Sequence, residues 1–78
     1  MRVLITGITG FVGSHLAEYV LNEHPGNEVY GIKRWRSPRN NISEIEHKVT
    51  LYDGDLNDLS SLITIFDQVK PEIIFHLA

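Results

Sequence analysis

Three glycines spaced three residues apart, Gly7, Gly10 and Gly13, carry the strongest chemical signal in this chain of 78 residues. They lie between a short apolar run, residues 2–6, and a segment with helical periodicity, so the chain passes through them from strand to helix. The first glycine permits a tight turn, the second lets a phosphate approach the backbone, and the third lets helix and strand pack closely. The free N–H groups of the helix N-terminus would bind the phosphates.

The alternative is a glycine-rich turn that binds nothing. Each glycine destabilises regular structure by roughly 0.5–1 kcal/mol, so a purely structural turn has little reason to use three. We therefore predict a dinucleotide site around the turn, and the residues expected to contribute to it are Thr6, Gly7, Thr9, Gly10, Phe11, Val12 and Gly13.

A cluster of positive charge follows the next predicted strand. Four of the seven basic residues lie at positions 33–39, which leaves three basic against ten acidic residues elsewhere. The strand ends about 20 residues beyond the glycines, where proteins that bind NAD place an Asp or Glu against the ribose 2′-hydroxyl. Arg34 follows it here, and a guanidinium binds a 2′-phosphate through paired hydrogen bonds.

The sequence therefore predicts NADP in preference to NAD. The residues expected to hold the 2′-phosphate are Lys33, Arg34, Arg36 and Ser37, while Trp35 and the arginine planes are available to flank adenine. A solvated basic loop without a ligand is the alternative. Nucleic acid is not an expected partner, because the acidic remainder of the chain would repel a phosphate backbone.

Composition excludes several other classes of protein. The chain has no Cys, so disulfides and thiolate metal sites are impossible, and its four His residues show no His-x-x-x-His spacing, so no metal site is predicted. No apolar run approaches the roughly 18 residues of a membrane span, and no signal peptide is evident. We expect a single soluble, cytoplasmic domain with a net charge of −3.

Periodicity and turn residues predict alternating strands and helices. Strands are expected at 2–6, 28–33, 49–52 and 72–78, long helices at about 12–23 and 59–69, and one helical turn at 42–46. The order β-α-β-β-α-β predicts an α/β protein, the N-terminal part of a Rossmann-fold doubly wound parallel sheet.

Several residues have expected places in these elements. On the first helix, Leu16, Tyr19 and Val20 are expected in the core. Asn41 or Ser43 is expected to cap the short turn, and Asp58 and Lys70 to lie in the first and last turns of the second helix.

Two strands are unusual. Gly31 should mark a close approach of another group to the second strand. The fourth is almost entirely apolar, which is typical of a strand covered on both faces and paired on both edges, a cover that 78 residues are not expected to supply in full.

The motif T-G-x-x-G-x-x-G from Thr6 to Gly13 resembles that of the extended short-chain dehydrogenase/reductase family, also called the NAD-dependent epimerase/dehydratase family, whose members modify nucleotide-activated sugars. Residues 29–34, 54–56 and 71–78 fit the same family, and within it the chain most resembles the GDP-mannose 4,6-dehydratases. The resemblance covers the whole chain. It implies that residues 1–78 are a partial NAD(P)-binding domain, truncated at its C-terminal end.

The resemblance also implies roles for residues near the strand ends. Asp55 would accept a hydrogen bond from the adenine amino group and Leu56 would pack on the ring, although an Asp after a strand is equally expected as a turn former. Leu77 and Ala78 would leave room for the cofactor. His15 is interpreted as a structural or solvent-exposed residue, and His76 as a packed or hydrogen-bonded strand residue.

Family chemistry requires a Tyr-x-x-x-Lys pair, and none of Tyr19, Tyr30 and Tyr52 has a lysine four residues later. No catalytic residue is therefore predicted. The resemblance implies that the full-length protein is an NADP-dependent dehydratase, homo-oligomeric, with a nucleotide-sugar substrate. A nucleotide-sugar epimerase or reductase of the same family and a non-catalytic NADP-binding sensor are the alternatives.

Overall fold

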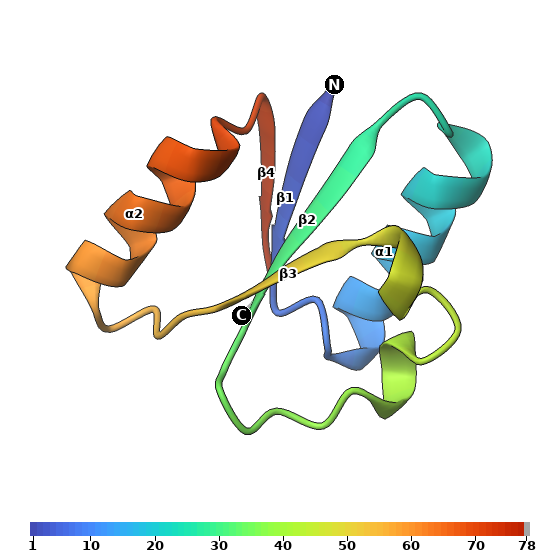
Figure 1. Ribbon diagram of the computed structural model, residues 1–78. Helices are drawn as coiled ribbons and strands as arrows, with labels where there is room; N and C mark the ends of the chain where they lie inside the picture. The colour runs from blue at the N-terminus through green and yellow to red at the C-terminus, as the bar shows by residue number, and fades with distance from the viewer. Residues whose placement is uncertain (78) are drawn as a thin grey trace.

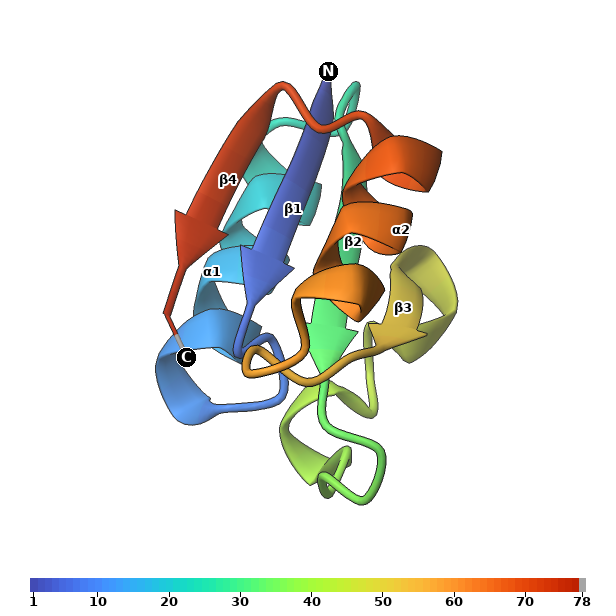
Figure 2. The ribbon, with the colours of Figure 1, turned by 90° about the vertical axis from the view of Figure 1, so that its left-hand side faces the viewer.

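The computed structural model describes residues 1–77, which form a parallel sheet with helices on both faces. The strands are β1 (Arg2–Thr6), β2 (Glu28–Lys33), β3 (Thr50–Asp53) and β4 (Ile73–His76), in the order β3-β2-β1-β4. Helix α1 (Phe11–Glu23) covers one face and α2 (Leu59–Val69) the other (Figures 1 and 2). The predicted α/β class and parallel sheet are confirmed.

Strand β1 lies at the centre of the sheet and is its most buried strand. It pairs with β2 along one edge and with β4 along the other. Val3 and Ile5 pack into the core on the α1 side, and Leu4 packs into the core on the α2 side. Successive side chains of a strand point to opposite faces, so Val3 and Ile5 belong to one core layer and Leu4 to the other. The prediction that β1 is buried on both faces is confirmed.

The buried face of α1 consists of small residues, namely Gly13, Ser14, Ala17 and Val20. The prediction that Tyr19 belongs to the core is wrong, since it is 56% exposed. Leu16 is half-buried at the edge of the core, and Val20 is buried as expected. The helix lies close to the sheet, and so its contact face is set by small residues and not by the largest apolar ones.

Helix α2 begins and ends with clear caps. Asp58 is its N-cap, and its carboxylate accepts hydrogen bonds from the backbone N–H of Ser60 at 3.2 Å and from the hydroxyls of Ser60 and Ser61. These hydrogen bonds hold the pKa of Asp58 below its usual range. Lys70 lies beyond the last turn, as a C-cap in the left-handed conformation with φ 50°, so the prediction that it lies within that turn is corrected.

The segment between β2 and β3 differs from the predicted single helical turn at 42–46. It contains two 3-10 turns, η1 (Asn40–Ile42) and η2 (Glu46–Lys48), on the α1 side of the sheet. Ile42 and Ile45 enter the core there, so burial of these two side chains sets the path of the segment. Neither turn has a side-chain cap, so Asn41 and Ser43 do not play the predicted capping role.

Strand β4 is partly exposed, as expected for an apolar strand in a chain this short. Within residues 1–77 it pairs only with β1, and its apolar side chains Ile73, Ile74 and Phe75 remain 36–46% exposed. Full cover on both faces and both edges is thus absent from the described part of the chain.

No helix within residues 1–77 is long and apolar enough to cross a membrane.

Gly31 confirms the expected close approach to β2. A Cβ atom added there would lie 2.5 Å from Cγ2 of Ile8, a fully buried residue of the turn after β1. The absence of a side chain at Gly31 therefore lets Ile8 pack directly against the sheet.

We predict that Gly31→Ala lowers the free energy of unfolding by about 1–3 kcal/mol, because Ile8 must move within a packed core. Gly26→Ala is the matched control, since its added Cβ meets nothing within 4 Å. Urea unfolding measures both variants. Equal stability of the two would contradict the packing role of Gly31.

Candidate functional site

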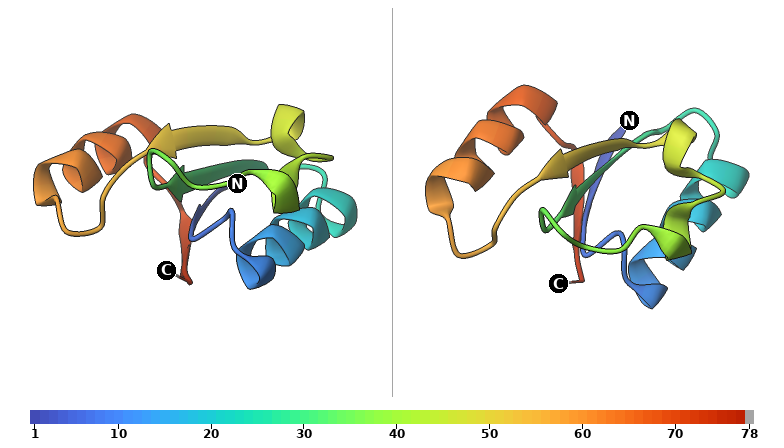
Figure 3. Two further views of the ribbon diagram at one scale, coloured as in Figure 1. Left: turned by 90° about the horizontal axis from the view of Figure 1, so that it is seen from below. Right: turned by 60° about the horizontal axis from the view of Figure 1, so that its bottom comes forward.

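Three loops meet at the carboxyl ends of the strands (Figure 3), the edge where open α/β sheets bind ligands. They are the glycine loop, residues 7–10, the basic loop, residues 34–39, and the loop at 54–57, and between them lies a cleft of about 550 Å³. The cleft is lined by Thr6, Gly7, Thr9, Gly10, Ile32, Lys33, Arg34, Ser37, Gly54, Asp55, Leu56, Asn57 and Leu77. Most of the predicted binding residues therefore lie together, while Ala78 is outside the described residues.

The glycine loop is tightly folded. Gly7 has a φ of 73°, a conformation that favours glycine, and its carbonyl accepts a hydrogen bond from the N–H of Gly10 at 3.0 Å. A Cβ on Gly13 would lie 2.1 Å from that same carbonyl oxygen. The predicted roles of the first and third glycines, a tight turn and close packing, are confirmed.

The N-terminus of α1 opens at the end of this loop. The first intrahelical hydrogen bond runs from the N–H of Ser14 to the carbonyl of Gly10, at 2.9 Å. The N–H groups of Phe11, Val12 and Gly13 therefore have no acceptor within the helix. The first turn contains no acidic residue and the Gly10 N-cap has no side-chain hydrogen bond, so this end attracts an anion.

Two of the four cations in the predicted cluster are already paired. The Lys33 ammonium forms an ion pair with Asp53, its neighbour across β2 and β3, and its side chain is only 9% exposed. Arg39 is paired with Glu46 at 2.7 Å. The Lys33 charge is thus satisfied within the sheet, which weakens the case for it as a ligand of the 2′-phosphate.

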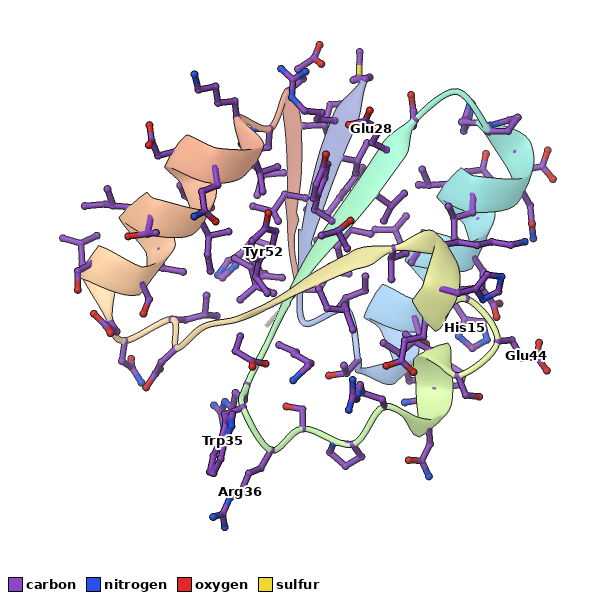
Figure 4. All side chains as sticks on the ribbon, in the orientation of Figure 1. His15, Glu28, Trp35, Arg36, Glu44 and Tyr52 are labelled. Carbon is purple, nitrogen blue, oxygen red and sulfur yellow. The ribbon has the colours of Figure 1, made fainter. Side chains whose placement is uncertain are left out.

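Arg34 and Arg36 have no carboxylate partner among residues 1–77, and Arg34 lines the cleft. The Arg36 guanidinium lies 4.5 Å from the ring centre of Trp35. The side chains of Trp35 and Arg36 project away from the sheet at the tip of the basic loop (Figure 4). Together with Asp53, Asp55 and Asn57 they line a second groove that adjoins the cleft. Arg36 is therefore placed at the outer margin of the site.

Asp55 supports both of the interpretations left open by the sequence. One carboxylate oxygen accepts the N–H of Asn57 at 2.9 Å, which makes the residue a turn former. Its other oxygen accepts no hydrogen bond from the described residues, and Asp55 lines both the cleft and the adjoining groove. A carboxylate in this position keeps one acceptor for a ligand.

A hydrogen-bonded contact between β1 and β4 was missed by the sequence analysis. The buried Thr6 hydroxyl lies 2.8 Å from Nδ1 of His76 and accepts the N–H of Leu77 at 3.1 Å. This contact fixes the carboxyl end of β4 beside the glycine loop. The interpretation of His76 as a hydrogen-bonded structural residue is confirmed, and that of His15 as well, since its ring bonds to the carbonyl of Phe11 at 2.8 Å.

Tyr30 is poorly suited to acid–base chemistry at neutral pH. The Tyr30 hydroxyl donates to Glu28 at 2.8 Å, and this hydrogen bond raises the pKa of Tyr30 above its ordinary value of 10.0. A catalytic tyrosine requires the opposite shift. Residues 1–77 also contain no group of three acidic or His side chains that could hold a metal ion.

Comparison with known proteins identifies the family. Residues 4–78 match the family model described as GDP-mannose 4,6 dehydratase. This chain belongs to that family. It is similar to the GDP-mannose 4,6-dehydratase of Yersinia enterocolitica, with 42% identity over 97% of the chain and 22% of the relative, and to that of Homo sapiens, with 44% identity over 95% and 22%. The chain thus spans about a fifth of the length of these relatives.

Solved structures agree with the fold and the family. UDP-glucose 4-epimerase of Thermus thermophilus in complex with NAD matches with a TM-score of 0.83 and 33% identity, over all of this chain and 24% of that one. The dTDP-glucose 4,6-dehydratase of Bacillus anthracis in complex with NAD has a TM-score of 0.90 and 21% identity, over 100% and 26%, and supports the fold alone. The expected Rossmann-type fold and the expected family are confirmed.

We predict that Gly13→Ala lowers the free energy of unfolding by about 3 kcal/mol or more, because a backbone carbonyl occupies the place of the new methyl group. Gly10→Ala should be much milder, since its Cβ would lie 3.3 Å from the carbonyl oxygen of Gly7. Thermal unfolding tests this order, and the reverse order would refute the proposed packing.

Proposed function

We propose that this chain binds the adenosine and pyrophosphate portion of NADP in a GDP-mannose 4,6-dehydratase. One observation supports the proposal: the cleft is lined both by Gly10, the N-cap that precedes the free amides of α1, and by Arg34, which has no carboxylate partner among residues 1–77. The amides suit a pyrophosphate and the guanidinium suits a terminal phosphate, so the cleft offers a site for each.

The other residues of the cleft complete this placement. The pyrophosphate would bind the N–H groups of residues 11–13, close to Gly10, where a side chain would obstruct it. The adenine amino group would donate to Asp55, with Leu56 against the ring. Arg34 and the Ser37 hydroxyl would hold the 2′-phosphate. The dinucleotide would then run from the basic loop past the glycine loop, toward Leu77 at the end of β4.

NADP is favoured over NAD by charge. No acidic residue stands directly after β2 to meet a ribose 2′-hydroxyl, and the chain continues there with Arg34. The two carboxylates that line the adjoining groove with Arg34, Asp53 and Asp55, are engaged in part by Lys33 and by the N–H of Asn57. A 2′-phosphate therefore meets an uncompensated cation at this position.

Family membership supports the reaction, in which GDP-mannose becomes GDP-4-dehydro-6-deoxymannose and water. NADP would supply a hydride acceptor for C4 of the hexose and return the hydride after water is eliminated across C5 and C6. The residues described here bind and orient the cofactor, and none of them moves a proton. Incubation of GDP-mannose and NADP with the full-length protein, followed by mass spectrometry, tests the reaction through the loss of one water.

We predict that Arg34→Ala weakens NADP binding at least tenfold while NAD binding changes less than about twofold, because a charge-assisted hydrogen bond contributes about 1.5–3 kcal/mol. Arg39→Ala is the control, since Arg39 is already paired with Glu46. Calorimetric titration gives both dissociation constants. An unchanged ratio between NADP and NAD would contradict the assignment of the 2′-phosphate to Arg34.

A further inference from the structure

We propose that Asn41 is a positioning residue that holds the basic loop in register with the glycine loop and thereby sets the preference for NADP. This role rests on the proposed function. It concerns a side chain outside the cleft, which acts only through the two loops that would contact phosphate groups.

The proposal rests on a hydrogen bond between two distant parts of the sequence. The side-chain amide of Asn41, in η1, donates to the carbonyl oxygen of Thr9 at 3.0 Å, across 32 residues. Thr9 lines the cleft and directly precedes Gly10, the N-cap of α1. One side chain thus connects the end of the basic segment to the loop that presents the free amides.

The basic loop is fixed at both ends and free between them. At its start, the N–H of Gly54 donates to the carbonyl of Lys33 at 2.9 Å, and the Lys33 side chain is paired with Asp53. At its end, Ile42 is fully buried in the core beside the Asn41 contact. Between these anchors, residues 34–36 are exposed, and a hydrogen bond of 3.0 Å from the N–H of Ser37 to the carbonyl of Arg34 forms a turn.

The two loops do not depend equally on Asn41. The glycine loop is held by its own contacts, the hydrogen bond from Gly10 to Gly7 and the packing of Gly13. Around Arg34 the basic loop has a single turn hydrogen bond, from Ser37, and its residues 34–36 are exposed. Loss of the Asn41 amide should therefore leave the pyrophosphate site in place and loosen the 2′-phosphate site, so that NADP is affected and NAD is not.

The test uses Asn41→Ala in the full chain, with Asn40→Ala as the matched control on the adjacent exposed residue. We expect NADP affinity to fall about fivefold, the equivalent of one hydrogen bond of about 1 kcal/mol, while NAD affinity stays within about twofold. Asn40→Ala should change neither. If Asn41→Ala folds poorly, Asn41→Ser is the second variant to test. Its shorter hydroxyl cannot replace the amide, so it should show the same selective loss of NADP affinity.

Other outcomes overturn the proposal in distinguishable ways. Equal weakening of NADP and NAD would mean that Asn41 supports only the glycine loop, and unchanged affinities would mean that the hydrogen bond positions nothing. If the wild-type chain binds neither dinucleotide, the proposed function itself is wrong and the role of Asn41 falls with it. If wild type binds both with equal affinity, there is no preference for Asn41 to set.

Discussion

The close approach of α1 to the backbone at Gly7 is the contact on which the rest of the site depends. No side-chain carbon fits at Gly13, where a Cβ would lie 2.1 Å from the Gly7 carbonyl oxygen. This proximity places the start of α1 at the carboxyl end of β1, where its N-cap, Gly10, lines the cleft. It also explains why the buried face of the helix is built from small residues such as Ser14 and Ala17.

The positive charge available to a ligand in the cleft is smaller than the four basic residues at positions 33–39 suggest. The basic cluster contributes two ion pairs that stabilise the fold, Lys33 with Asp53 and Arg39 with Glu46. Its remaining cations are left for a ligand, and only Arg34 lies in the cleft proper. The loop therefore combines these ion pairs with the proposed binding role of Arg34, which lies at the point where β2 ends.

Local signals were sufficient to predict the order of elements, the buried β1 and the roles of Gly7 and Gly13. These depend on short-range spacing and on backbone conformations that few residues other than glycine adopt. The exposure of Tyr19 was not predictable in the same way, because the contact face of α1 follows from how close the helix lies to the sheet. A search for small residues at helical spacing, Gly13, Ala17 and Val20, would have found that face.

Contacts across the sheet were beyond the reach of the sequence. The partner of Lys33 is fixed by the register of β2 against β3, and the partner of Asn41 by the burial of Ile42. The Thr6 and His76 contact likewise requires β4 to lie beside β1. Each of these interactions joins residues at least 20 positions apart, so composition and periodicity carry no signal for them.

The central claim is that α1 and Arg34 bind, respectively, the pyrophosphate and the 2′-phosphate of one NADP molecule. A crystal structure of the protein in complex with NADP tests it most directly. We expect pyrophosphate oxygens within hydrogen-bond distance of the amides of residues 11–13, and the 2′-phosphate on the Arg34 guanidinium. A pyrophosphate bound away from the N-terminus of α1, or a 2′-phosphate that contacts only solvent, would contradict the account.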